Sequence, residues 1–197
     1  MIRLTEVAHQ HVALTLHIGD VAVDATAGNG HDTQFLAQLV GPTGRVFAID
    51  IQPTAIARTQ IHISTIGCSN VTLICGDHAQ LQHLIPLEYR EKIAVVMFNL
   101  GYLPDASHHI ITQAETTIAA LEAAIELLAS GGLLTVMAYP GHPGGEQETE
   151  AVAYFLTKHT AINTNVFETD TLGKRTSPKL YICRKYDPST ANSVSAN

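Results

Sequence analysis

Three acidic residues, Asp24, Asp50 and Asp77, follow three successive apolar segments of the chain and could together bind a nucleoside. If the apolar segments are parallel strands, their carboxyl ends meet at one edge of a sheet, which is where such sheets bind ligands. Asp50 could accept two hydrogen bonds from a ribose diol, and Asp77 could accept one from an adenine amino group. Capping of the next helix is the alternative role for each acid. Three acids in succession favour an adenosine-containing ligand.

The turn after the first of these acids contains two glycines, Gly28 and Gly30, that allow a sharp bend and close approach of a ligand. A helical pattern follows, and Asp32 and Thr33 are placed to cap its free N–H groups. Such a helix start can hold an anionic group. The turn is not Gly-x-Gly-x-x-Gly, because Thr26 stands where many nucleotide-binding turns keep a glycine. S-adenosylmethionine therefore fits better than NAD, while an ordinary strand-to-helix loop is the alternative interpretation.

Two later loops carry candidates for binding an acceptor group. Asn99 and Tyr102 follow the fourth apolar segment, and Tyr139 and His142 lie in a glycine-rich loop after the fifth. The first loop resembles the Asn-Pro-Pro-Tyr loop of amino-methylating enzymes, with Leu100-Gly101 in place of Pro-Pro. There the asparagine oxygen would orient an amine and the aromatic ring would stack on a base. The alternative is an asparagine that caps a turn and a tyrosine that covers the core.

Short apolar runs alternate with segments of helical spacing along the chain. We expect strands at 21–24, 45–50, 70–75, 92–98, 133–138, 161–168 and 178–185. We expect helices at 4–18, from the glycine turn to about residue 40, from 53 to 66, and at 79–84, 110–129 and 146–158.

This alternation predicts an α/β fold with a parallel sheet and helices on both faces. The last two strands leave no room for a helix between them, so we expect an antiparallel hairpin at one edge of the sheet. The arrangement is that of the Rossmann-like class I methyltransferases, with seven strands of which the last is antiparallel. Residues 1–186 are expected to form one domain, and 187–197 a polar tail.

Length and composition exclude several classes of protein. With 197 residues and 46% hydrophobic residues, the chain can bury a sizeable core. It has neither an apolar run long enough to cross a membrane nor a recognisable signal peptide, so we expect a cytoplasmic protein without membrane contact. The three cysteines and eleven histidines show no metal-ligand spacing, and no metal is expected.

The formal net charge of −7 argues against a broad, sequence-independent grip on nucleic acid. Basic residues are concentrated near the C-terminal end, at Lys174, Arg175, Lys179, Arg184 and Lys185. This group is the candidate phosphate-binding surface, and a homodimer could join two such surfaces.

Five motifs together resemble the YtqB/MnmM family of class I methyltransferases, long labelled rRNA methylases and now associated with methylation of tRNA. They are Asp24-Ala-Thr-Ala-Gly-Asn-Gly-His-Asp-Thr33, Asp50-Ile-Gln52, Gly76-Asp77-His78, Asn99-Leu-Gly-Tyr-Leu-Pro104 and Tyr139-Pro-Gly-His-Pro-Gly-Gly145. The resemblance covers essentially residues 4–185.

The resemblance implies S-adenosylmethionine as cofactor and the anticodon stem-loop of tRNA as partner. The reaction implied is methylation of the 5-aminomethyl group of 2-thiouridine at wobble position 34. By resemblance, the cofactor-binding residues are Asp24, Ala27, Gly28, Asn29, Gly30, His31, Asp32, Asp50, Gln52, Asp77 and His78. Two alternatives are an rRNA base methyltransferase and a regulatory protein that binds S-adenosylmethionine without catalysis.

Overall fold

The computed structural model describes residues 3–101, 113–168 and 177–187. Within these residues the strands form one seven-stranded sheet in the order β3-β2-β1-β4-β5-β7-β6. The strands are β1 (Val21–Asp24), β2 (Arg45–Asp50), β3 (Val71–Cys75), β4 (Ile93–Asn99), β5 (Leu128–Ala138), β6 (Ile162–Glu168) and β7 (Lys179–Lys185). The first five are parallel, and β7 is antiparallel to both β5 and β6. The predicted topology is confirmed.

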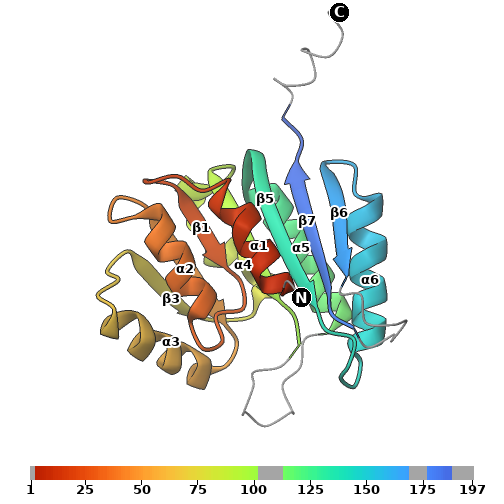
Figure 1. The fold of residues 1–197 in the computed structure, drawn as a ribbon, viewed down its shortest axis with the longest axis horizontal. Helices are drawn as coiled ribbons and strands as arrows, with labels where there is room; N and C mark the ends of the chain where they lie inside the picture. The colour runs from red at the N-terminus through yellow and green to blue at the C-terminus, as the bar shows by residue number, and fades with distance from the viewer. Residues whose placement is uncertain (1–2, 102–112, 169–176, 188–197) are drawn as a thin grey trace, which may run out of the picture.

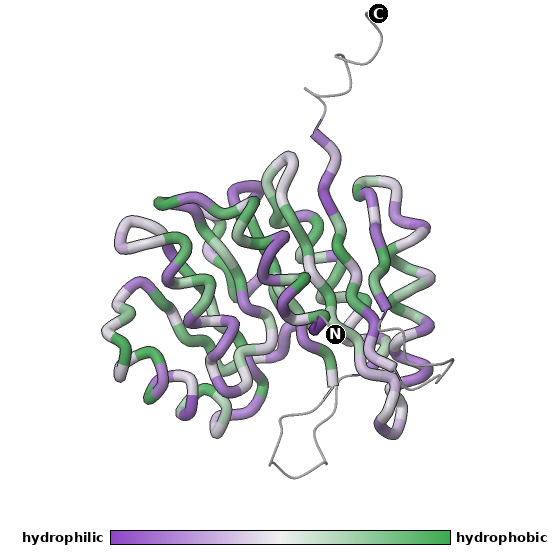
Figure 2. Tube along the Cα trace, viewed as in Figure 1, coloured by the Kyte–Doolittle hydropathy of each residue, from purple (hydrophilic) through white to green (hydrophobic). Residues whose placement is uncertain are grey.

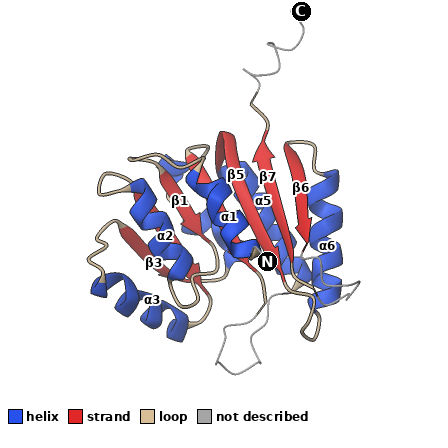
Figure 3. Cartoon of the chain, in the orientation of Figure 1, coloured by secondary structure: helices blue, strands red, loops and turns tan. Residues whose placement is uncertain are grey.

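Helices cover both faces of this sheet, as Figures 1 and 3 show. They are α1 (Leu4–Ala13), α2 (His31–Val40), α3 (Pro53–Thr65), α4 (Leu81–Leu84), α5 (Ala114–Leu127) and α6 (Gly145–Lys158), with the 3₁₀ turns η1 (His78–Gln80) and η2 (Leu87–Tyr89). In Figure 1, α1, α2 and α3 lie in front of the sheet, and α4 and α5 lie behind it.

Alternate residues of the central strands face two separate cores. In β4, Val95 and Met97 pack with α1 and α2, whereas Val96 and Phe98 pack with α5. This follows from the period of two in a strand, and it makes β4 apolar along nearly its whole length. Figure 2 shows the resulting hydrophobic colouring along the central strands.

The predicted ends of two helices are wrong, and so are the predicted starts of the helix at 110 and of the strand at 133. The helix expected at 4–18 ends at Ala13, and the apolar residues Leu14 and Ile18 are 82% and 78% exposed. The buried residues Leu4, Ala8 and Val12 recur every four residues, and neither exposed residue lies on that face.

The helix expected to reach residue 129 ends at Leu127, and β5 begins at once with Leu128. Gly131 and Gly132 therefore do not end the helix but lie inside the strand. The pairing of β5 with β4 is irregular there, since Ile93 pairs with Leu128 but Val95 pairs with Leu133.

The parallel register brings the predicted site residues to one edge of the sheet. Asp24 pairs with Ala48 of β2 and Met97 of β4, two residues before the ends of those strands. Asp50 and Asn99 are the last residues of β2 and β4. Among the described residues, no helix is long and apolar enough for a membrane span.

Candidate active site

The glycine turn between β1 and α2 is held by backbone hydrogen bonds at the edge of the sheet. The Ala27 N–H donates to the Ile49 carbonyl at 2.8 Å, and the Gly30 N–H donates back to the Ala27 carbonyl at 2.8 Å. Gly28 and Gly30 have φ angles of 55° and 85°, a region that favours glycine. A Cβ on Gly30 would also lie 3.1 Å from Thr59 of α3, so this glycine lets two helices approach each other.

The start of α2 differs from the prediction. Gly30 is the N-cap residue, and no side chain in the described part of the chain caps this helix. The Asp32 and Thr33 side chains are hydrogen-bonded elsewhere, to His9 and Asn99 and to Asp24, respectively. The first N–H groups of α2 are therefore available to an anionic group of a ligand, such as a carboxylate.

Asp24 lies beneath the turn and has no exposed surface. Its carboxylate accepts hydrogen bonds from Thr33 Oγ1 at 2.6 Å and from the Thr26 N–H at 3.2 Å. Burial raises the pKa of Asp24 from 3.8 to about 7, the charge of Asp32 adds to the rise, and the two hydrogen bonds oppose it. Asp24 therefore shapes the turn, and its direct contact with a ligand stays a prediction.

Asp50 is oriented at the edge by two backbone donors. Its carboxylate accepts from the Gly28 N–H and from the Gln52 N–H, both at 2.9 Å. An ionised carboxylate has about four acceptor positions, so two remain for a diol. Gln52 itself is buried as the N-cap residue of α3, and exposed Ile51 lies between it and Asp50.

Asp77 caps a short turn with one oxygen, because its Oδ1 accepts the Ala79 N–H at 2.9 Å. The neighbouring His78 ring lies edge-on to Phe98, with ring centroids 5.9 Å apart. Burial lowers the pKa of His78, although the charges of Asp77, Glu148 and Asp50 oppose this shift. Burial at this place therefore favours the neutral form of the His78 imidazole.

Two other predicted cofactor residues lie on the surface formed by α2 and α3. The Asn29 side-chain oxygen accepts from Arg58 at 3.3 Å. The exposed His31 ring packs edge-on against His62, with centroids 5.0 Å apart.

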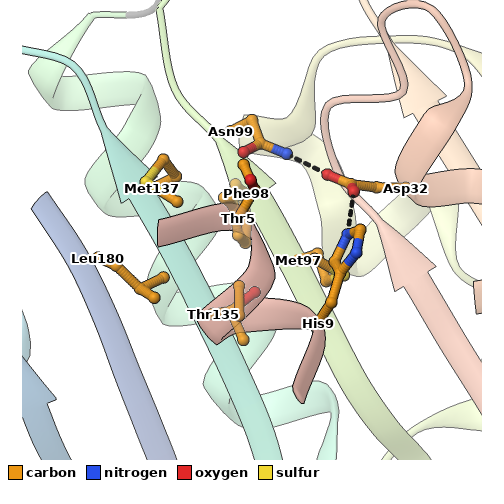
Figure 4. A pocket seen from close by; sticks show the side chains of 10 residues that line it. Thr5, His9, Asp32, Met97, Phe98, Asn99, Thr135, Met137 and Leu180 are labelled. Carbon is orange, nitrogen blue, oxygen red and sulfur yellow. Dashed lines mark hydrogen bonds and ion pairs between the residues drawn. The ribbon is translucent and has the colours of Figure 1, made fainter. Parts of the chain in front are cut away.

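Asp32 joins three elements that are distant in the sequence. Its Oδ1 lies 2.6 Å from His9 Nε2, and its Oδ2 accepts a hydrogen bond from Asn99 Nδ2. The Asn99 backbone N–H donates to Thr26 Oγ1 at 2.7 Å. The glycine turn, the end of β4 and helix α1 are thus connected (Figure 4).

The segments that follow β4 and β5 approach each other at the edge of the sheet. A Cβ on Gly101 would stand 3.5 Å from His142 Nε2. Tyr139 is close enough to Asp32 for that charge to raise its pKa, although burial is the larger cause. Asn99, Tyr139 and His142 therefore gather at one place, whereas Tyr102 lies outside the described residues.

The C-terminal basic group is not one surface. Lys179 forms an ion pair with Glu168 at 2.9 Å at the site edge of the sheet. Arg184 donates to the Gly131 carbonyl, and Lys185 donates to the Leu128 carbonyl, both at the opposite edge. Lys174 and Arg175 lie outside the described residues.

Sequence reasoning missed several polar residues of the site. His9 is one of them, because nothing in the spacing of the sequence connects it with Asp32, 23 residues away. Glu148, at the start of α6, is 2% exposed, accepts from Thr117 Oγ1 at 2.6 Å and lies near enough to His78 to affect its pKa. Among the described residues, no group of three or more His, Cys, Asp or Glu side chains could hold a metal ion.

Two family models match the chain. The model described as "Putative rRNA methylase" matches residues 46–185. The model described as "Protein-L-isoaspartate(D-aspartate) O-methyltransferase" matches residues 3–84, which contain the glycine turn and the three acids.

A curated relative is the "tRNA (mnm(5)s(2)U34)-methyltransferase, chloroplastic" of Arabidopsis thaliana. It is 38% identical over 164 residues, which cover 78% of this chain and 58% of the relative. The chain thus spans less than two thirds of that protein's length.

Solved structures share the whole fold. The "putative rRNA-methylase" from Clostridium thermocellum has 38% identity and a TM-score of 0.87, covering 94% of this chain and 98% of its own. A "putative methyltransferase" from Streptococcus mutans, in complex with SAH, has 32% identity and a TM-score of 0.82, covering 94% and 99%.

Proposed function

This chain belongs to the family described as "Putative rRNA methylase", and from that premise we propose that it is an S-adenosylmethionine-dependent tRNA methyltransferase. The proposed acceptor is the 5-aminomethyl group of (2-thio)uridine at position 34 of the anticodon stem-loop. The observation that carries the proposal is the Asn99 carboxamide, held by Asp32 at the end of β4 beside the acid-lined edge. The name of the Arabidopsis relative and the SAH complex of the Streptococcus structure support it.

The residues at the edge fit S-adenosylmethionine. Asp50 keeps two acceptor positions for the ribose hydroxyls, and Asp77 keeps one oxygen for the adenine amino group. The uncapped first turn of α2 offers N–H groups to the methionine carboxylate. When bound, this cofactor supplies an electrophilic methyl group on a positively charged sulfur, which the acids at the edge favour electrostatically.

The acceptor end of the site suits an amine. An alkyl amine has a pKa near that of lysine, about 10.4, so it is mostly protonated near neutral pH and has no free lone pair. The site must therefore bind the minor neutral form or help the ammonium lose a proton. The Asn99 oxygen can accept an amine N–H, and Tyr139 and His142 stand beside it for contact with the nucleotide.

An rRNA base methyltransferase is the second candidate, favoured by the description of the matching family model. It would use the same cofactor edge and differ only in its acceptor. For either acceptor, residues other than Arg184 and Lys185 would contact the RNA phosphates. These two side chains donate hydrogen bonds to backbone carbonyls at the opposite edge of the sheet.

Methylation of defined RNA tests the proposal. Purified protein is incubated with labelled S-adenosylmethionine and either tRNA carrying 5-aminomethyl-2-thiouridine, tRNA lacking that group, or rRNA. We expect one methyl group on the modified nucleoside of the first RNA alone, as detected by mass spectrometry. Transfer to rRNA alone would favour the second candidate, and no transfer to any RNA would contradict both.

Cofactor binding is tested separately by calorimetry. Asp50→Ala should weaken S-adenosylmethionine binding at least tenfold, because hydrogen bonds to a charged group contribute about 1.5–3 kcal/mol each. Asp20→Ala is the matched control, since Asp20 precedes β1 at the opposite edge of the sheet and should leave the affinity unchanged. Equal affinities of all three proteins would contradict the assignment of Asp50.

A further inference from the structure

We propose that His9 and Asp32 act as positioning residues that hold and polarise the Asn99 carboxamide toward the acceptor amine. This inference rests on the proposed amine methylation and assigns a role in it to helix α1. The resemblance of the motifs placed Asp32 with the cofactor, whereas the structure places its two oxygens on His9 and Asn99.

The orientation of the Asn99 amide follows from the chemistry of its partner. An ionised carboxylate only accepts hydrogen bonds, so the Asn99 NH₂ must face Asp32. The Asn99 carbonyl oxygen then points away from Asp32, as Figure 4 shows, and receives no hydrogen bond from the described residues. Without Asp32, the amide could rotate by half a turn and present its NH₂ to the amine, which is the wrong polarity.

His9 fixes Asp32 in the same way from the other side. Its Nε2 lies 2.6 Å from Asp32 Oδ1 and must carry the proton that the carboxylate accepts. The His9 ring is itself held by Phe35, against which it stacks with centroids 3.9 Å apart and an interplanar angle of 12°. The His9 and Asp32 side chains are only 32% and 19% exposed, so water competes weakly for these hydrogen bonds.

The pocket beside His9, Asp32 and Asn99 is too small to hold a ligand of its own. It lies between α1 and the ends of β4 and β5, and its volume is about 10 Å³, which is room for about one water molecule. Pockets that enclose whole small ligands are usually about 300–1,000 Å³. The contacts of His9 and Asp32 therefore serve to hold Asn99 at the end of β4.

The charge of Asp32 strengthens the Asn99 oxygen as an acceptor. In the transfer, the amine lone pair forms the new nitrogen–carbon bond, and the carbon–sulfur bond breaks with its electron pair on sulfur. The nitrogen becomes positively charged and later releases a proton to solvent. A hydrogen bond from the Asn99 NH₂ to a carboxylate polarises the amide, so its oxygen binds the increasingly positive N–H group more strongly.

Variants of His9 separate positioning from packing. His9→Phe keeps a ring against Phe35 but removes the donor to Asp32, and His9→Gln supplies a donor at nearly the position of Nε2. We expect His9→Phe and Asp32→Asn to lower kcat on the order of ten- to hundredfold, because small misplacements of reacting groups cost that much. His9→Gln should restore most of kcat, and S-adenosylmethionine affinity should change little in the His9 variants. His11→Gln, a substitution on the same helix, is the control that leaves kcat unchanged.

Non-additivity and a spectroscopic readout complete the test. In the Asp32→Asn background, His9→Phe should have no further effect on kcat, because it acts through Asp32. In NMR spectra, the Asn99 side-chain amide signal should shift in His9→Phe and return in His9→Gln. Equal kcat values in His9→Phe and the unsubstituted protein, additive losses, or an unmoved Asn99 signal would each overturn the inference. An unsubstituted protein that methylates no RNA would instead overturn the proposed function, and the NMR result would still decide whether His9 and Asp32 hold Asn99.

Discussion

Replacement of Asp24 by asparagine should change how the stability of the ligand-free protein depends on pH. Asp24 is completely buried, and burial is the main cause that raises its pKa from 3.8 to about 7 in the folded protein. Asparagine has nearly the same shape and can still accept a hydrogen bond from Thr33, but it does not ionise. The variant therefore removes the titration while keeping most of the packing.

The sign and size follow from the two pKa values of Asp24. Between pH 3.8 and about 7, folded protein holds a proton that the unfolded chain has released, so the free energy of unfolding falls as pH rises. The stabilisation that comes from protonated Asp24 is fully present below pH 3.8 and is lost once the pH exceeds about 7. Roughly two pKa units of this interval lie between pH 5 and pH 8, and one unit corresponds to about 1.4 kcal/mol. The expected loss over that range is about 3 kcal/mol.

Urea unfolding at pH 5, 6, 7 and 8 measures this effect. The stability of Asp24→Asn, relative to the unsubstituted protein, should rise by about 3 kcal/mol from pH 5 to pH 8. Thr33→Val should act in the opposite direction, because the Thr33 hydrogen bond lowers the pKa of Asp24. A relative stability of Asp24→Asn that is constant to within about 1 kcal/mol would refute the reasoning.

Three further predictions concern packing and surface charge. Gly30→Ala should lower Tm more than Gly67→Ala, because both glycines have positive φ but only at Gly30 would a Cβ meet the neighbouring helix α3; equal losses in thermal melts would contradict this. Thr117→Val should lower the free energy of unfolding by about 1–3 kcal/mol, since it removes a donor to the buried Glu148 carboxylate. A loss below about 1 kcal/mol in urea titrations would contradict this prediction. Lys185→Gln should lower stability by up to about 1 kcal/mol and leave the salt dependence of tRNA binding unchanged, because Lys185 binds carbonyls at the end of α5. A shallower salt slope in filter-binding assays would show that Lys185 contacts phosphate.

Much of the fold could be predicted from the sequence because its signals are local. Each central strand is a short apolar run, each is followed by a turn or helix signal, and Pro53 begins α3 as expected. The places where prediction failed are those where a local signal meets a tertiary requirement. Leu14 extends an apolar pattern but lies off the buried face of α1, and Gly131 and Gly132 stand inside a strand although glycines commonly end helices.

The candidate site was predicted in part for the same reason. Asp50 and Asp77 could be placed at the edge because each lies at or just after the end of an apolar run that the sequence identifies as a strand. Their oxygens are oriented by backbone N–H groups close in space, which leaves acceptor positions for a ligand. The role of Asp32 could not be predicted, because its partners are 23 and 67 residues away in the sequence.

By itself, the sequence determined the alternating fold, the glycine turn and the row of acids at the carboxyl edge. Only the tertiary structure decided that Asp24 is buried beneath the turn while Asp50 remains at the edge. It also showed that Lys179 and Arg184 are far apart, because they lie near the two ends of β7, at opposite edges of the sheet. Hydrogen bonds between distant segments and the loss of water around a charge depend on what the folded chain brings near each residue. Residue type and spacing alone therefore do not fix them.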